Sequence, residues 1–181
     1  MATRAVAARA RKVRLLVMDV DGVLTDGRMM LSERGDELKA FNTHDGLAIA
    51  LAKRAGIKTA MVTGESSPIA KARGAKLGVD SVVLGARRKG EVVQALLAEH
   101  NVPAEAAAYI GDDLIDIPAM QIVGLAVAVA DAPAAVKAVA HHVTRAAGGH
   151  GAVRELVELV LTSQLSWRRI VADYVREHGG R

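Results

Sequence analysis

Two short acidic clusters are the best candidates for chemistry in this sequence. Asp19 and Asp21 stand one residue apart where an apolar run ends, and a second run is followed by Asp112, Asp113 and Asp116. Like charges this close raise each other's pKa unless a cation or hydrogen-bond donors stabilise the ionised form. Carboxylates with no His or Cys nearby in the sequence favour a hard cation, and Mg²⁺ fits better than Ca²⁺. For either cluster alone, ordinary turn aspartates that cap helices remain the alternative.

Two more polar residues occupy comparable places. Thr63 and Gly64 end another apolar run, and Lys89 stands just before a predicted helix. A threonine hydroxyl and the first backbone amides of a helix can hold phosphate oxygens, and a lysine ammonium balances their charge. Taken singly, Thr63 would be a helix-entry residue and Lys89 a solvated charge. With the two acidic clusters, they favour one phosphate-binding site built from four successive strand ends.

Such a site requires a sheet that brings the strand ends together. Short, nearly continuous apolar runs alternate with helical stretches, which is the pattern of a parallel sheet with helices on both faces. We therefore predict an α/β fold with a doubly wound, Rossmann-like sheet. The five expected strands are residues 13–18, 57–62, 81–84, 107–110 and 125–129. Parallel strands end at one edge of a sheet, so both acidic clusters would meet there.

Helices are expected between these strands. Ser67 and Pro68 begin one, with a capping residue followed by proline in the first turn, and Gly78 ends it. The other expected helices are residues 90–100, 132–140 and 152–165.

Residues 28–41 interrupt this alternation. Two apolar stretches, 29–31 and 37–41, flank a polar turn that contains Gly35, which predicts a β-hairpin. The hairpin follows the first strand directly, so it would project as a flap beside the carboxyl edge of the sheet, where open α/β folds bind ligands.

The length of 181 residues fits one domain with a short extension at each end. We expect a basic N-terminal tail over residues 1–12 and a catalytic domain over 13–165 that includes the flap. A C-terminal tail would occupy residues 166–181, with a short amphipathic helix from Trp167 to Tyr174.

Charge and composition exclude several classes of protein. The net charge is +4, but the basic residues crowd the N-terminus, where we expect a solvated tail, and aromatic residues do not alternate with them, so no nucleic-acid partner is predicted. The absence of cysteine excludes disulfides, thiolate metal sites and a cysteine nucleophile. The first apolar run ends at Asp19, too soon for a membrane span, so we expect no membrane partner and a cytoplasmic location by default.

The ordered motifs resemble those of the haloacid dehalogenase superfamily of phosphotransferases. Its four motifs match Asp19 to Asp21, Thr63, Lys89 and residues 111–116, and the likeness covers nearly the whole chain. It implies that Asp19 attacks phosphorus to form an aspartyl-phosphate. It also implies that Asp21 protonates the leaving alkoxide and then activates water, while Thr63 and Lys89 stabilise the charge of the transferring phosphoryl group.

The same resemblance implies a Mg²⁺ cofactor. The carboxylates of Asp19 and Asp112 and the backbone carbonyl of Asp21 would hold the ion, with Asp113 and Asp116 in supporting positions.

The chain has no room for the large cap domain that covers the site in many members of this superfamily. Only the hairpin separates Asp21 from the helix near Asn42, and only a helix and a strand separate Thr63 from Lys89. The capless branch that the sequence resembles forms ring-shaped tetramers, in which neighbouring subunits close the pocket. We therefore expect a homotetramer; a monomer whose macromolecular substrate acts as the lid is the alternative.

Closer similarity is to the family of phosphatases that act on 3-deoxy-D-manno-octulosonate (KDO) 8-phosphate. It appears in residues 39–42, 45–46, 111–116, 127–131 and 143–155. The likeness implies a small sugar-phosphate substrate of the lipopolysaccharide pathway. The substrate contacts it implies are Asp21, Asn42, Thr43, His44, Asp45, Gly46, Thr63, Gly64, Glu65, Arg73 and Lys89.

The sequence departs from this family where His44, Ala50, Glu65 and His150 replace its usual arginines. These changes remove positive charge from a pocket that must recognise a carboxylate. Glu65 and Arg73, with the Asn-Thr pair at 42–43, look more like phosphatases of sialic-type nine-carbon 9-phosphates. We therefore predict a 2-keto-3-deoxy sugar-acid phosphate as substrate, with the eight-carbon compound first and a nine-carbon one as the alternative.

Two other classes of protein share features of this sequence. A phosphosugar- or nucleotide-binding regulator could have kept the fold and lost turnover, but the presence of both Asp19 and Asp21 argues against it. A dinucleotide-binding oxidoreductase is disfavoured because the first turn carries acids where a glycine-rich pyrophosphate loop is needed.

Overall fold

A parallel sheet organises the chain, and its central strand ends at Asp19. The computed structural model describes residues 3–35 and 37–180. The sheet has six strands in the order β5-β4-β1-β6-β7-β8, and all pairs are parallel. The strands are β1 (Leu15–Asp19), β4 (Lys58–Val62), β5 (Ser81–Val83), β6 (Ala107–Gly111), β7 (Leu125–Ala128) and β8 (His142–Val143).

The chain winds outward from β1 in both directions. It runs through β4 to β5 on one side, then returns to β6 on the other side of β1 and continues to β7 and β8. In the register, Asp19 lies opposite Val62 of β4, and Met18 lies opposite Ile110 of β6. The three central strands therefore end at the same edge, at the point where the winding reverses, which is where such sheets bind ligands. The predicted doubly wound α/β fold is confirmed.

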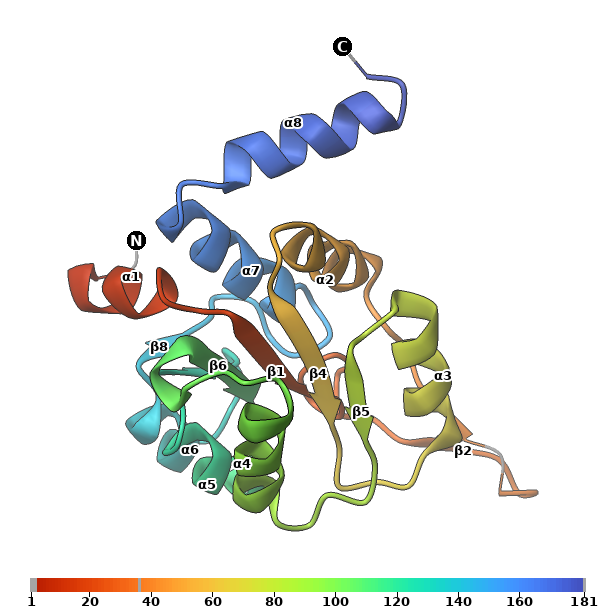
Figure 1. Cartoon of the computed structure of the whole chain (residues 1–181). Helices are drawn as coiled ribbons and strands as arrows, with labels where there is room; N and C mark the ends of the chain where they lie inside the picture. The colour runs from red at the N-terminus through yellow and green to blue at the C-terminus, as the bar shows by residue number, and fades with distance from the viewer. Residues whose placement is uncertain (1–2, 36, 181) are drawn as a thin grey trace.

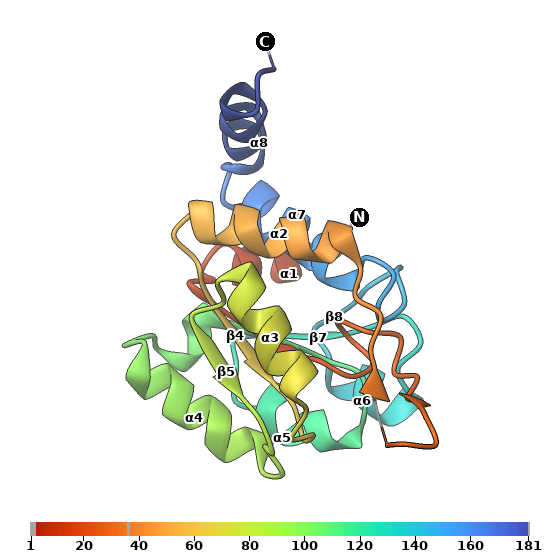
Figure 2. The same ribbon diagram turned by 90° about the vertical axis from the view of Figure 1, so that its right-hand side faces the viewer.

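Helices cover both faces of the sheet (Figures 1 and 2). Contacts join the helices of one face, α1 (Arg4–Ala10), α2 (Thr43–Arg54), α3 (Pro68–Leu77) and α7 (Ala152–Ser163). Those of the other face are α4 (Lys89–Glu99), α5 (Ile117–Met120) and α6 (Ala134–Val139). Short 3₁₀ turns at Ala104–Ala106 and Leu114–Asp116 complete the connections.

Local sequence sets where α3 begins and ends, as expected. Ser67 occupies the N-cap and Pro68 the first turn, where the missing amide hydrogen of proline removes no helical bond. Gly78 ends the helix with φ +62°, in the left-handed region that glycine adopts without strain.

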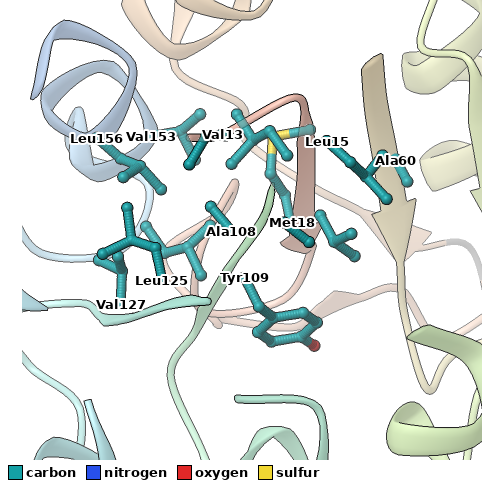
Figure 3. Packing of buried hydrophobic residues seen from close by; sticks show 14 of the residues in the cluster. Val13, Leu15, Met18, Ala60, Ala108, Tyr109, Leu125, Val127, Val153 and Leu156 are labelled. Atoms are coloured by element: carbon teal, nitrogen blue, oxygen red, sulfur yellow. The ribbon is translucent and has the colours of Figure 1, made fainter. Parts of the chain in front are cut away.

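The core lies between the sheet and its helices and is built mainly from Ala, Val, Leu and Ile. Figure 3 shows Leu156 and Val153 of α7 packed near Leu125 of β7. Tyr109 is fully buried, and its hydroxyl points away from this apolar cluster. A buried phenol needs a hydrogen-bond partner, which the site described below supplies.

The predicted hairpin is confirmed, with shorter strands than expected. β2 (Met30–Leu31) and β3 (Glu37–Leu38) pair antiparallel, and the hairpin projects from the body of the domain beside the strand ends (Figure 1). The structure shows no cap domain over the described residues.

The expected solvated N-terminal tail is wrong for residues 4–10. They form α1, which packs against α7 with Val6 and Ala10 buried. These two apolar positions are four residues apart and so share one face of a helix, while Arg4 and Arg9 remain exposed. Strand β8 was also absent from the expected set.

The expected amphipathic helix near the C-terminus is present as α8 (Trp167–Glu177). It extends away from the body beyond α2 and α7, and Ile170 is its one buried residue (Figures 1 and 2). Residues 1–2, 36 and 181, which belong to the two predicted tails and the hairpin turn, lie outside the described residues. Within the described part of the chain, no helix is long and apolar enough to cross a bilayer.

Packing of α7 on the sheet should contribute strongly to stability. Leu156→Ala is expected to lower the free energy of unfolding by about 3 kcal/mol, because the fully buried side chain leaves a cavity between α7 and the sheet. Urea denaturation measures this change. Leu165→Ala, at a side chain that is 91% exposed, is the matched control and should change the stability by less than about 0.5 kcal/mol. Equal losses in the two variants would contradict this account of the core.

Candidate active site

Three carboxylates from two neighbouring strands meet at the carboxyl edge of the sheet. Asp19 ends β1, and Asp112 and Asp116 follow β6, which pairs with β1. One oxygen from each of the three lies within 4.8 Å of the others. The predicted convergence of the two acidic clusters is therefore present in the structure.

Lys89, the first residue of α4, supplies positive charge to this cluster. Its Nζ lies 2.7 Å from Oδ1 of Asp19 and 2.7 Å from Oδ1 of Asp116, and its side chain is only 2% exposed. Burial alone would lower the pKa of Lys89, but the two carboxylates raise it above its ordinary value. The ammonium group therefore remains protonated inside the site.

Asp116 is held by four hydrogen bonds and is fully buried. Its Oδ1 accepts from the Tyr109 hydroxyl at 2.6 Å as well as from Lys89, and its Oδ2 accepts from the backbone amides of Asp112 at 2.9 Å and Asp113 at 3.1 Å. Because both oxygens are already bonded, Asp116 is suited to fixing Lys89 and the loop after β6. It is less suited to holding a metal directly.

The cluster carries more negative charge than Lys89 can neutralise. Burial and the nearby Asp116 carboxylate raise the pKa of Asp19 well above its ordinary value, and they raise that of Asp112 to about 6. Oxygen ligands with excess negative charge are the chemistry that binds a hard divalent cation. Asp19 and Asp112 are the residues placed to hold one.

Gly22 allows Asp112 to approach the loop after β1. Its φ is +85°, and a Cβ at this position would lie 2.1 Å from Oδ2 of Asp112. Any side chain here would displace that carboxylate, so the glycine is part of the acidic site. Asp113 lies differently: its Oδ1 accepts from the amide of Leu114 at 2.7 Å and caps the following 3₁₀ turn.

Asp21 and Thr63 form a second pair at the same edge. The Thr63 hydroxyl donates to Oδ2 of Asp21 at 3.0 Å, and it accepts from the amide of Glu65 at 3.0 Å. Oδ1 of Asp21 lies 2.5 Å from Nζ of Lys39, a residue just after β3. The four predicted catalytic residues thus form two contacting pairs at this edge of the sheet, Asp19 with Lys89 and Asp21 with Thr63.

Two of the predicted substrate contacts make hydrogen bonds within the protein. The Asn42 side chain caps α2 by accepting from the His44 amide at 2.8 Å, and its Nδ2 donates to the carbonyl of Gly149 at 3.2 Å. Asp45 is 1% exposed and accepts from the backbone amides of Gly151 and Arg154, which begin α7. Both residues therefore join α2 to the loop before α7.

Arg73 contacts the segment that leads into α2. Its guanidinium sits over the Phe41 ring, with 5.3 Å from Cζ to the ring centroid, and donates to the backbone carbonyl of Asn42 at 3.4 Å. A Cβ on Gly46 would lie 2.7 Å from Arg73, so this glycine makes room for the arginine. Of the remaining predicted contacts, Thr43, His44 and Glu65 are exposed and Gly64 is half-buried.

The sequence did not indicate that Glu37, Lys39 and Tyr109 belong to the site. Ser67 was expected only at the start of a helix, and its hydrogen bond to Glu37 was not foreseen. Strand alternation places Glu37 and Lys39 on the same face of the hairpin, a signal that could have drawn attention to both. Tyr109, two residues before Gly111, is a lone aromatic among small residues of a buried strand. Its hydroxyl required a partner, but the partner itself depends on the tertiary structure.

Comparisons with known proteins agree with this geometry. Residues 81–156 match the model of a family of haloacid dehalogenase-like hydrolases. The 3-deoxy-D-manno-octulosonate 8-phosphate phosphatase KdsC of Escherichia coli strain K12 is 45% identical over 159 residues, which cover 88% of this chain and 85% of the relative. The KdsC of Yersinia pestis is 45% identical over 156 residues, covering 86% and 83% of the two chains.

Solved structures show the same likeness. The phosphatase of Yersinia pestis superposes with a TM-score of 0.89 at 43% identity, covering 91% of this chain and 89% of that chain. The Moraxella catarrhalis 3-deoxy-D-manno-octulosonate 8-phosphate phosphatase, solved with magnesium, phosphate and KDO, superposes with a TM-score of 0.91 at 34% identity, covering 93% and 97%. The chain belongs to the haloacid dehalogenase-like hydrolases and, within them, to the KdsC family of phosphatases.

Asp112 and Asp113 are adjacent in sequence, but only Asp112 is expected to bind Mg²⁺ directly. Asp112→Asn should weaken Mg²⁺ binding by about tenfold or more, because it removes a charged ligand from the cluster. Isothermal titration of the purified protein with MgCl₂ measures the affinity. Asp113→Asn keeps the oxygen that caps Leu114 and should change the affinity little. A larger loss in Asp113→Asn than in Asp112→Asn would contradict the assignment.

Proposed function

We propose that the chain is a magnesium-dependent phosphomonoester hydrolase that converts KDO 8-phosphate to KDO and phosphate. The observation that carries the proposal is the meeting of buried Asp19 and Lys89 with half-buried Asp112 at the switch point of the sheet. The extent of the identity to KdsC phosphatases supports the substrate. Exposed departures at His44 and Glu65 keep a nine-carbon sugar-acid 9-phosphate as the second candidate.

The proposed reaction proceeds in two steps. A carboxylate oxygen of Asp19 bonds to phosphorus while the bond to the sugar oxygen breaks, and the leaving oxygen takes a proton from Asp21. Water then attacks the aspartyl-phosphate and gives its proton to Asp21, which releases phosphate and restores the Asp19 carboxylate. Lys89 and Thr63 balance charge on the phosphoryl oxygens.

Mg²⁺ would be held by Asp19, Asp112 and the backbone carbonyl of Asp21, with Asp116 and Asp113 supporting the loop. When bound, it supplies positive charge that lets the phosphate dianion approach Asp19.

The substrate contacts proposed beyond the catalytic residues are those of the loop at the start of α2 and of the segment after β4. Thr43, His44, Gly64 and Glu65 are accessible enough to contact the sugar. Asn42 and Asp45 act on this account by holding the loop in place, since their polar atoms are occupied in structural contacts. Nη2 of Arg73 donates to the same loop, whereas its buried Nε has no hydrogen-bond partner among the described residues.

A phosphate-release assay tests the function. With Mg²⁺, the wild-type protein should hydrolyse KDO 8-phosphate faster than a nine-carbon sugar-acid 9-phosphate, and EDTA should abolish release. Asp19→Asn should lower the rate by at least about a thousandfold while retaining the circular dichroism spectrum, because the amide is a poor nucleophile. An active Asp19→Asn would refute the nucleophile, and preference for the nine-carbon substrate would reverse the order of the two candidates.

We also propose a cytoplasmic homotetramer whose catalytic unit is residues 13–165, with residues 166–181 as a tail. Exposed apolar side chains on the hairpin, Met29, Met30, Leu31 and Leu38, support an interface there, because an isolated flap would leave them in water.

Sedimentation equilibrium of the wild type should give four times the subunit mass. The double variant Met30→Ser and Leu31→Ser should dissociate, whereas Leu165→Ser, at an exposed site beside α8, should not. A monomeric wild type would refute the tetramer.

A further inference from the structure

A chain of polar contacts links the hairpin to Asp21. Nζ of Lys39 lies 2.5 Å from Oδ1 of Asp21 and 2.8 Å from Oε1 of Glu37, and the Lys39 side chain is 1% exposed. The Ser67 hydroxyl donates to Oε2 of Glu37 at 2.9 Å. The chain therefore runs from the start of α3 through the hairpin strand to the end of β1.

These contacts leave the Asp21 carboxylate with little rotational freedom. Lys39 of the hairpin holds one oxygen, and the hydroxyl of Thr63, just after β4, holds the other. Because both oxygens accept hydrogen bonds, the orientation of the carboxylate is fixed.

Lys39 is charged and is itself held in place. Burial alone would lower the pKa of Lys39, but its hydrogen bonds to Asp21 and Glu37 raise that pKa above its ordinary value. The hydrogen bond from Lys39 is the main cause of a lowered pKa at Glu37. A buried ammonium with two carboxylate partners needs both, because removing one would leave its charge poorly compensated.

We propose that Lys39 is a positioning residue that orients the Asp21 carboxylate for the second step, the hydrolysis of the aspartyl-phosphate. Glu37, fixed by Ser67, holds Lys39 in turn. This inference rests on the proposed function and assigns the hairpin a role inside its own subunit. Placement of a base within hydrogen-bond reach of water is what gives general-base catalysis its advantage, so a carboxylate free to rotate loses rate in that step.

The test uses p-nitrophenyl phosphate, whose leaving group departs without a proton. Lys39→Met keeps the length of the side chain and removes the ammonium. It should form the aspartyl-phosphate at the wild-type rate and hydrolyse it about tenfold more slowly or worse. Stopped-flow absorbance should therefore show a burst of p-nitrophenolate approaching one equivalent per subunit, followed by a slow steady state. Lys39→Arg should restore most of the steady-state rate.

Two controls separate orientation from damage to the fold. Lys58→Met breaks a lysine–aspartate pair with Asp80 at the opposite end of β4 and should turn over like the wild type. The Mg²⁺ affinity and the circular dichroism spectrum of Lys39→Met should match those of the wild type. If Lys39→Met does not fold, Glu37→Gln replaces it as the test. This variant weakens the ion pair that holds Lys39, so it should show the same burst with a smaller loss of turnover.

The outcomes distinguish this inference from the proposed function. A wild type that releases no phosphate with Mg²⁺ would overturn the function and the inference together. An active wild type with normal turnover in Lys39→Met, or with slow turnover and no burst, would overturn the inference alone. If Glu37→Gln is the variant tested, its normal turnover would likewise overturn the inference alone.

Discussion

The structure depends on the burial of several carboxylates beside too few positive charges. Asp19, Asp112 and Asp116 crowd the end of the sheet, and Lys89 is the ammonium among them. Burial and repulsion disfavour the ionised forms of Asp19 and Asp112 and raise the pKa of each. Four hydrogen bonds stabilise the Asp116 carboxylate. Asp19 and Asp112 lack such compensation, and a divalent cation would neutralise their charge. A site that is electrostatically incomplete without a cation is well suited to receive a metal and a phosphate together.

Much of the surrounding structure serves to hold loops against this edge. Gly22 leaves space for Asp112 beside the loop after β1. Tyr109 connects the core to the site, because its hydroxyl donates a hydrogen bond to Asp116. On the other side, Asp45 and Asn42 attach α2 to the loop that precedes α7. The loops that border the site are thus tied to the two helical layers, so the positions of the acids follow from the packing of the core.

The fold and the centre of the site were predictable because both rest on local patterns. Five strands, four of them buried and β5 half-buried, appear as nearly continuous apolar runs. Parallel strands end together, so Asp19, Thr63 and the acids after β6 could be placed at one edge without coordinates. The N-terminal segment was predicted to be a solvated tail because its composition is basic. It is instead a helix that packs against α7 through Val6 and Ala10. Asn42 and Asp45 were expected to contact substrate from the family resemblance alone, and their hydrogen bonds to backbone groups of a distant loop were not foreseen.

The sequence alone determined the order of chemical groups along the strand ends, since residue type and periodicity are properties of short segments. Only the tertiary structure decided which side chains pair. Lys39 reaches Asp21 across the hairpin, and Asp45 reaches amides more than a hundred residues away, at the start of α7. Such pairings depend on how whole elements pack, because a hydrogen bond requires its two atoms within about 3 Å and no local pattern specifies a distance between remote segments.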